Sequence, residues 1–75
     1  MNYNEQLEDF KIGQIIFADI HYEEDTDSEA QFVKIIKASN YFGLIVEINP
    51  RAGMPFTVQF GSQRLTMHAL EVKKL

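Results

Sequence analysis

Hydrophobic and polar residues alternate most clearly in the second half of the chain. The alternation covers residues 42–48, 56–60 and 64–67, which are rich in β-branched and aromatic side chains. A period of two with this composition is typical of half-buried β-strands. The pattern predicts three antiparallel strands in succession. In the first strand, the inward positions are Phe42, Leu44, Val46 and Ile48, opposite Gly43, Ile45 and Glu47.

Turn residues separate these three strands. Pro50 cannot donate a hydrogen bond to a strand ladder, and Gly53 can take a positive φ, so the chain breaks after Ile48. Gly61 and Ser62 lie between the second and third strands. A two-residue loop that begins with glycine fits a type II′ hairpin turn. The glycines and prolines of this region also leave no window long enough for a stable helix.

The first half of the chain is less regular. Residues 15–22 alternate and predict a strand, which a hydrophilic loop at 23–29 follows. Residues 30–38 are also strand-like, although their inward face is unclear. The end of this segment is compatible with a short helix, but its β-branched residues favour a strand. Residues 68–71 predict a single 3₁₀ turn, and residues 72–75 predict a closing edge strand whose lysines discourage edge-to-edge pairing.

A chain of 75 residues without repeats or a linker predicts one domain. We assign residues 1–9 to a polar N-terminal arm and residues 10–75 to the domain. Asn4 is a good N-cap for one helical turn through the arm, and a frayed arm is the alternative. The predicted core consists of Ile16, Ala18, Ile20, Val33, Ile35, Leu44, Val46, Ile48, Phe56, Val58, Phe60, Leu65 and Leu70.

The order of these elements resembles the SH3-like small-barrel class, which includes Tudor and KOW domains. The segments that carry the resemblance are KIGQIIFADI, GLIVEI and FTVQF-GS-QRLTM-HALEVKKL. The resemblance implies a mostly β fold, a small five-stranded barrel with a short N-terminal arm or helical turn. It also implies that residues 23–29 replace the long first loop that such barrels often use for binding. Members of this class bind peptides, modified side chains, nucleic acids or whole proteins.

Charge is distributed unevenly along the chain. Residues 1–30 contain nine acids and one base, a net charge of −8, whereas residues 31–75 contain two acids and six bases, a net charge of +4. A cluster of like charge often only keeps a small domain soluble. The functional alternative is an acidic loop that docks on the basic surface of a protein partner. The predicted contact residues are Tyr22, Glu23, Glu24, Asp25, Asp27, Glu29 and Tyr41.

Three versions of a binding function follow. In the first, the carboxylates of the loop stand in for phosphates, as in anti-CRISPR or anti-restriction inhibitors that mimic nucleic acid. In the second, the domain is a KOW- or Tudor-like reader that binds nucleic acid or a modified peptide. It would use a basic patch of Lys34, Lys37, Arg51 and Arg64, or an aromatic cage of Tyr22, Tyr41 and Phe42. In the third, the chain is a structural subunit of a larger assembly.

The sequence offers little for catalysis or metal binding. It has no cysteine, no nucleophile elbow and no phosphate-binding glycine loop, so we expect neither an enzyme nor a cofactor. Asp25, Asp27 and Glu29 have the spacing of calcium ligands, but Ala30 and Ile36 stand where the loop requires glycine and glutamate. The histidines, His21 and His68, are more often structural than a metal pair.

The same composition predicts the compartment. The absence of cysteine excludes a disulfide and favours a reducing environment. The N-terminus lacks the features of a secretory leader, and no apolar run approaches the ~20 residues of a membrane span. We therefore expect a cytoplasmic protein without a membrane partner.

Overall fold

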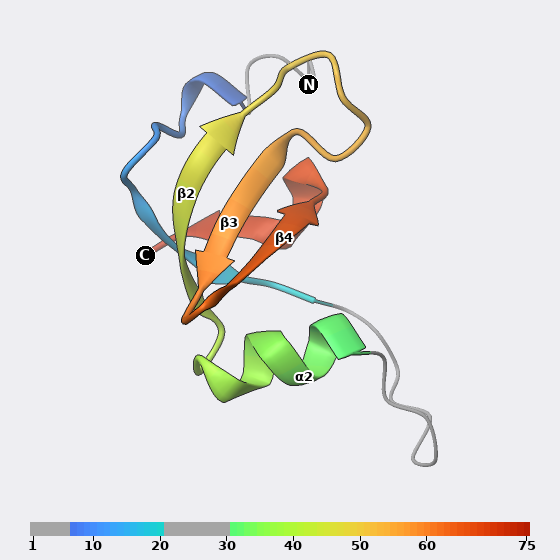
Figure 1. The fold of residues 1–75 in the computed structure, drawn as a ribbon. Helices are drawn as coiled ribbons and strands as arrows, with labels where there is room; N and C mark the ends of the chain where they lie inside the picture. The colour runs from blue at the N-terminus through green and yellow to red at the C-terminus, as the bar shows by residue number, and fades with distance from the viewer. Residues whose placement is uncertain (1–6, 21–30) are drawn as a thin grey trace.

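A computed structural model describes residues 7–20 and 31–75. Besides the helical residues 7 and 8, the described residues form five strands, one α-helix and one 3₁₀ helix (Figure 1). In chain order, these are β1 (Ile15–Ala18), α2 (Gln31–Ala38), β2 (Phe42–Ile48), β3 (Phe56–Phe60), β4 (Gln63–Met67), η1 (Ala69–Glu71) and β5 (Val72–Lys74).

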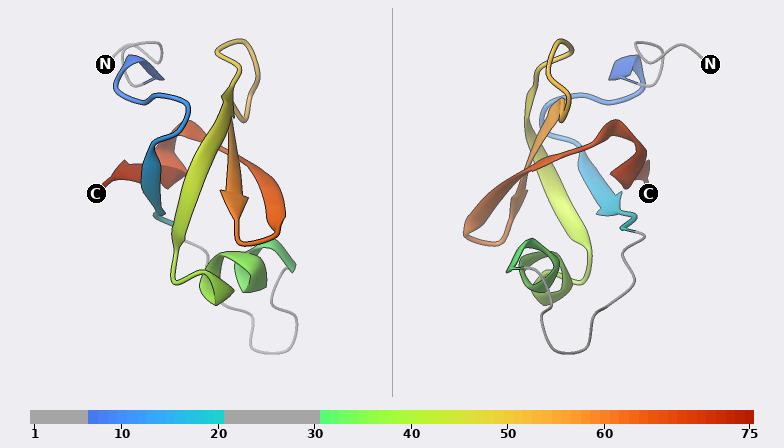
Figure 2. Two further views of the ribbon diagram at one scale, coloured as in Figure 1. Left: turned by 60° about the vertical axis from the view of Figure 1, so that its left-hand side comes forward. Right: turned by 90° about the vertical axis from the view of Figure 1, so that its right-hand side faces the viewer.

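The five strands form one antiparallel sheet in the order β4-β3-β2-β1-β5. The prediction of a small, mostly β, five-stranded fold is therefore confirmed. The sheet is strongly twisted, so that β1 and β5 pass behind β3 and β4 and the inner faces share one core (Figures 1 and 2). It is not closed into a barrel, because β5 ends after three residues and pairs with β1, while β4 pairs only with β3 among the described strands.

The predicted turns of the second half are confirmed. Gly61 has a φ of +58° and Phe60 pairs with Gln63, as expected for a two-residue hairpin that begins with glycine. The 3₁₀ turn follows β4 directly, and the short lysine-bearing strand follows it. In the first half, the strand predicted at 15–22 ends at Ala18, and residues 21 and 22 lie outside the described residues.

The prediction of a strand at residues 30–38 is wrong over the part that is described, because residues 31–38 form α2. The three-residue spacing of Val33 and Ile36 places both side chains on one face of a helix, and both are buried. α2 covers the end of the sheet where β3 and β4 are joined (Figure 1). Packing of this face against the sheet outweighs the weak strand preference of the β-branched residues.

The predicted faces of β2 are reversed in its first half. Gly43 and Ile45 are buried, whereas Phe42 and Leu44 are exposed. The pairing with β3 explains the reversal, because it shifts between Ile45, which faces Val58, and Glu47, which faces Thr57. Val46 is thus the extra residue of a β-bulge. A bulge changes the phase of the alternation between inward and outward residues. The pattern after the bulge therefore does not indicate which residues before it face the core.

Gly43 provides the second reason for this reversal. A Cβ atom at this position would collide with Val58 Cγ1 and lie 2.7 Å from Phe60 Cε1. The inner face here is already filled by the side chains of β3, so only a glycine fits. Phe42 and Leu44, on either side of Gly43, therefore point to the outer face of the sheet.

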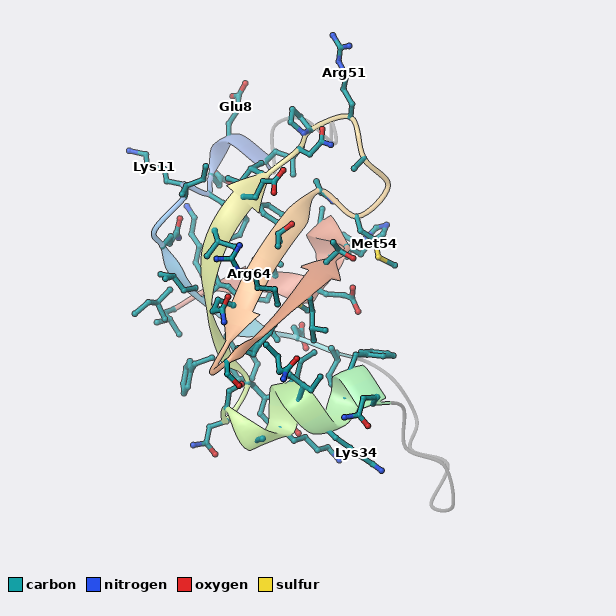
Figure 3. All side chains as sticks on the ribbon, viewed as in Figure 1. Glu8, Lys11, Lys34, Arg51, Met54 and Arg64 are labelled. Atoms are coloured by element: carbon teal, nitrogen blue, oxygen red, sulfur yellow. The ribbon has the colours of Figure 1, made fainter. Side chains whose placement is uncertain are left out.

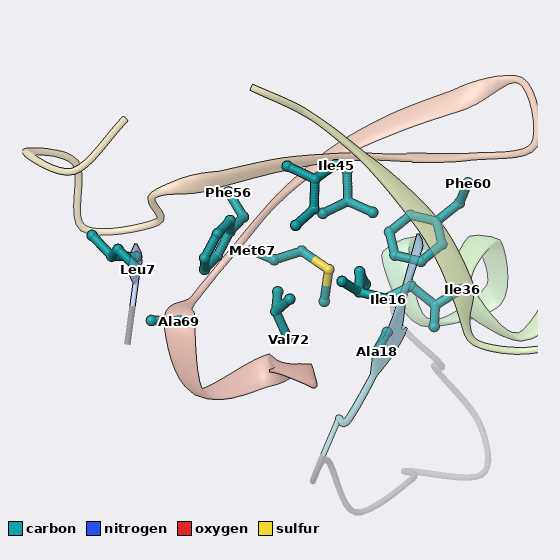
Figure 4. Packing of buried hydrophobic residues seen from close by; sticks show 11 residues of the cluster. Leu7, Ile16, Ala18, Ile36, Ile45, Phe56, Phe60, Met67, Ala69 and Val72 are labelled. Carbon is teal, nitrogen blue, oxygen red and sulfur yellow. The ribbon is translucent and has the colours of Figure 1, made fainter. Parts of the chain in front are cut away.

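The core agrees with the prediction at most of its positions (Figure 4). Of the predicted residues, six are buried: Ile16, Ala18, Val33, Phe56, Val58 and Phe60. Five are half-buried: Ile20, Ile35, Val46, Ile48 and Leu65. Leu44 and Leu70 are exposed, so their assignment to the core is wrong. The prediction omitted eight of the buried residues that the structure describes: Leu7, Ile36, Gly43, Ile45, Pro55, Met67, Ala69 and Val72.

The N-terminal segment joins this core where it is described. Leu7 is buried against the main cluster, and its carbonyl accepts a hydrogen bond of 3.2 Å from Phe10 N–H. The Phe10 ring meets Phe56 edge to face, with 5.2 Å between the centroids. Residues 7–10 are therefore attached to the inner face of the sheet. The predicted Asn4 cap lies outside the described residues.

Candidate functional site

Four large apolar side chains are exposed together on the outer face of β1 and β2. Their exposed fractions are 55% for Ile15, 37% for Phe17, 47% for Phe42 and 39% for Leu44. The antiparallel register places Ile15 opposite Leu44 and Phe17 opposite Phe42. The four residues thus form a two-by-two block of cross-strand neighbours. We call this block the outer patch.

Aromatic contacts extend the outer patch to Tyr41. The ring of Phe17 lies 5.9 Å from that of Phe42 in an edge-to-face arrangement, and 5.7 Å from that of Tyr41 at an interplanar angle of 34°. These separations are those of rings in favourable contact. Phe17 therefore joins the other two rings into one aromatic cluster at the start of β2.

The backbone holds Tyr41 in an uncommon conformation. α2 ends in a Schellman motif, in which Tyr41 N–H donates to Ile36 O at 3.0 Å and Asn40 N–H donates to Lys37 O at 3.0 Å. Asn40 has a φ of 56° and Tyr41 a φ of 67°. A left-handed conformation suits asparagine but costs a residue such as tyrosine about 1–2 kcal/mol. The Tyr41 carbonyl accepts a hydrogen bond of 2.7 Å from Ala18 N–H, which fixes this turn to β1.

Polar residues border the outer patch on both sides. Lys73 of β5 lies opposite Phe17, and Gln59 of β3 lies opposite Leu44. Beyond Gln59, the Arg64 guanidinium donates from Nε to Gln59 Oε1 at 2.7 Å. An apolar centre with a polar rim is the usual anatomy of a protein–protein interface.

Of the predicted contact residues, the structure describes only Tyr41. The other six, Tyr22, Glu23, Glu24, Asp25, Asp27 and Glu29, lie outside the described residues. The sequence contained one signal for the outer patch, namely the apolar residues on both sides of the strand that begins at Ile15. Phe42 was named only for the aromatic cage, and Leu44 was assigned to the core because the bulge at Val46 reverses its phase.

The bases proposed for nucleic-acid binding do not gather. Figure 3 shows Lys34 on α2 at one end of the molecule and Arg51 at the opposite end, with Arg64 on the sheet between them. The basic patch of Lys34, Lys37, Arg51 and Arg64 is therefore not formed. Of the three residues of the proposed aromatic cage, the structure describes Tyr41 and Phe42. Both rings pack against the ring of Phe17.

His68 has a structural role. It is the N-cap of η1, where Leu70 N–H donates to His68 Nδ1 at 3.3 Å and His68 N–H donates to Glu71 Oε1 at 2.9 Å. This reciprocal pair is a capping box. The other histidine, His21, lies outside the described residues. Across residues 7–20 and 31–75, no three His, Cys, Asp or Glu side chains are grouped to hold a metal ion.

Comparison with known proteins gave no match to a family model, to a curated protein or to a solved structure. In the part of the chain that is described, no helix is long and apolar enough to span a membrane. The function of the chain must therefore be inferred from its own residues.

Proposed function

We propose that the protein is a non-enzymatic, protein-binding module whose contact surface is the outer patch. The observation that carries the proposal is the block of four exposed apolar side chains in register across β1 and β2. Contiguous apolar surface of this kind, bordered by polar residues, marks interaction sites in soluble proteins. The strained backbone of Tyr41 adds support, because such residues are concentrated at functional sites.

In its architecture, we propose an open member of the SH3-like small-barrel class. Two features support this assignment, the strand order β4-β3-β2-β1-β5 and the 3₁₀ turn directly before the last strand. The long connection between β1 and β2, which includes α2, takes the place of the first loop of that class. The proposed function does not depend on this assignment, because it rests on the outer patch alone.

A protein partner fits the outer patch better than a nucleic acid does. Phosphate recognition requires several converging bases, but Lys34, Arg51 and Arg64 are widely separated (Figure 3). The net charge of −4 also opposes binding to a polyanion. The expected setting is the cytoplasm, because the chain has no cysteine with which to form the disulfides of small secreted domains.

The acidic segment at residues 23–29 is proposed as a second contact. It carries five acids and no base, and it follows β1, which supplies two residues of the outer patch. Such a field steers association with a basic surface, and its carboxylates can replace the phosphates of a nucleic acid in an inhibitory complex. The outer patch would then supply most of the buried apolar area, and the acidic segment would increase the association rate.

The test is affinity capture from a lysate of the source organism with four tagged proteins. The first is the wild type, and the second carries Phe42→Thr and Leu44→Thr in the outer patch. The third is a matched control with Lys34→Ala and Arg51→Ala, two exposed residues that belong neither to the outer patch nor to its polar border (Figure 3). The fourth has Glu23, Glu24, Asp25 and Asp27 replaced by alanine. Circular dichroism confirms that each variant is folded.

The proposal predicts a protein that the wild type and the control capture and the patch variant does not. With the purified partner, we expect the acidic variant to show slower association and a weaker dependence on salt. Capture that is unchanged by the patch substitutions contradicts the proposed surface. Loss with the acidic variant alone assigns binding to that segment, and recovery of nucleic acid without protein favours the reader alternative.

A further inference from the structure

Within residues 7–20 and 31–75, the sheet has two free edges, which differ in how well they are protected. β5 is three residues long and contains Lys73 and Lys74, and short charged strands discourage pairing with another chain. β4 is five residues long, and its only charged residue is Arg64. It contains no proline, and its pairing with β3 runs without a shift from Phe60 to Phe56. The β4 edge is thus regularly paired on its inner side and, among the described residues, left open to pairing on the other.

The hairpin fixes which backbone groups of β4 face this edge. Phe60 and Gln63 flank the two-residue turn, so they form a hydrogen-bonded pair. Because hydrogen-bonded and non-hydrogen-bonded pairs alternate, Leu65 and Met67 also bond to β3. Arg64 and Thr66 therefore direct their N–H and C=O groups away from β3. Within the described residues these groups have no backbone partner, since β4 is the last strand of the sheet.

An apolar pocket lies beside the same edge. It has a volume of about 280 Å³ and is formed by α2, β4, η1 and the loop before β3. Its lining residues are Phe32, Ile36, Met54, Leu65, Thr66, Met67 and Glu71. The Thr66 hydroxyl donates to the Met54 sulfur at 3.5 Å, which places the flexible Met54 side chain beside the edge (Figure 3). Small-molecule sites occupy about 300–1,000 Å³, so this pocket better fits a side chain of a partner.

We propose that the β4 edge binds an extended segment of a partner protein, which adds as a sixth strand and inserts an apolar side chain into this pocket. Backbone groups of Arg64 and Thr66 supply the hydrogen bonds, and the pocket supplies specificity, as in other cases of strand addition. This surface shares no residue with the outer patch, so the inference goes beyond the proposed function and can fail independently of it.

Strand geometry specifies the partner further. The residue opposite Leu65 points to the inner side, towards the pocket, whereas the residue opposite Arg64 points to the outer side. An acidic residue is favoured opposite Arg64, because oppositely charged cross-strand pairs are stabilising. The partner strand should therefore place a large apolar residue next to an acid. If a second copy of the chain paired with this edge through its own β4, the only charged residue of that strand would be Arg64. A second copy therefore does not supply the acid.

The first experiment measures amide hydrogen exchange in the free protein. Because their N–H groups face the open edge, Arg64 and Thr66 should exchange at least about tenfold faster than Leu65. Equal protection of the three amides would overturn the proposal, since the edge would already be covered.

The second experiment selects binders from a phage-displayed library of short random peptides. The selected peptides should contain a large apolar residue adjacent to an acid and should protect the Arg64 and Thr66 amides from exchange. N-methylation of the peptide residues opposite Arg64 and Thr66 should weaken binding by about tenfold or more, because it removes backbone hydrogen bonds. Selection of no binder, or of peptides that leave both amides unprotected, would overturn the proposal.

Thr66→Pro and Thr66→Val provide a matched pair on the protein side. Proline removes the outward N–H but no hydrogen bond to β3, whereas valine keeps the N–H. We expect about a tenfold loss of peptide affinity for Thr66→Pro and little change for Thr66→Val. If the proline variant does not fold, the N-methylated peptides test the same backbone hydrogen bonds from the side of the peptide.

A concentration-dependent dimer that forms through β4 would instead assign the edge to a second copy and overturn the proposal. The Phe42→Thr, Leu44→Thr variant should bind the peptides normally, which separates this test from that of the outer patch.

Discussion

The two halves of the outer face of the sheet differ sharply in polarity. On β3 and β4, the outward residues are polar, namely Thr57, Gln59, Arg64 and Thr66. On β1 and the first half of β2, the corresponding residues are those of the outer patch. Both halves face the same side of one sheet, and both contribute inward residues to the same core. The core therefore requires no apolar residue on the outer face. On β3 and β4, polar residues occupy the outward positions without loss of the sheet.

The largest effect should separate neighbouring residues that lie on opposite faces of β2. Ile45→Ala should reduce the free energy of unfolding by about 2–5 kcal/mol, because Ile45 is fully buried and its truncation leaves a cavity. Leu44→Ala should cost less than about 1.5 kcal/mol, since Leu44 is partly exposed. Denaturant unfolding measures both values. A larger loss for Leu44 would show that the faces of β2 are assigned wrongly.

Gly43→Ala should have the next largest effect. The added methyl group collides with Val58 and Phe60, and overpacking of this kind typically costs about 1–3 kcal/mol. Gly53→Ala is the matched control, because no atom lies within 4 Å of an added Cβ there and φ is not positive. The midpoints of chemical denaturation compare the two variants. Equal midpoints would mean that the inner face has room at Gly43, and hence that sterics do not force Phe42 and Leu44 outward.

A smaller effect should distinguish the two halves of the outer face directly. Phe17→Thr removes the ring that contacts both Tyr41 and Phe42, so it should destabilise the protein by about 1–2 kcal/mol. Gln59→Thr, on the polar half, should change stability by no more than about 0.5 kcal/mol. Thermal unfolding of the two variants provides the measurement. A neutral Phe17→Thr substitution would indicate that the aromatic cluster contributes only to binding.

The smallest effect on stability is expected at Tyr41. Tyr41→Gly relieves about 1–2 kcal/mol of backbone strain but loses the ring contact with Phe17, so the two changes should nearly cancel. The stability should stay within about 1 kcal/mol of the wild type, while affinity for the captured partner decreases. Asn40→Gly is the control for relief of strain without loss of a ring. Unchanged partner affinity in Tyr41→Gly would exclude Tyr41 from the binding surface.

Local signals in the sequence were sufficient to locate β2, β3, β4 and the elements at the end of the chain. The alternation at residues 56–60, the glycine of the Gly61–Ser62 turn and the lysines of β5 are all short-range features. α2 was not predicted because its apolar face stabilises the helix only by packing against the sheet, which the local sequence does not show. The reversed phase of β2 depends on the space left by Phe60 and Val58, which are remote in the sequence.

The candidate site was less accessible to sequence analysis than the fold. Tyr41 was singled out for its aromatic ring near a loop, but its positive φ and its contact with Phe17 are properties of the folded chain. Phe42 and Leu44 look like core residues by composition. Their exposure results from a register shift against β3, which no local pattern in β2 reveals. The acidic segment and Tyr22 remain predictions.

The bulge at Val46 has a consequence for how such a surface can arise during evolution. In a regular β2 paired with β3 as at Ile48 and Phe56, Phe42 and Leu44 would fall on the buried side. One inserted residue transfers both of them to solvent without changing either side chain. A single inserted codon can thus convert part of an ordinary hydrophobic core into exposed apolar surface, provided that the residue between Phe42 and Leu44 is a glycine.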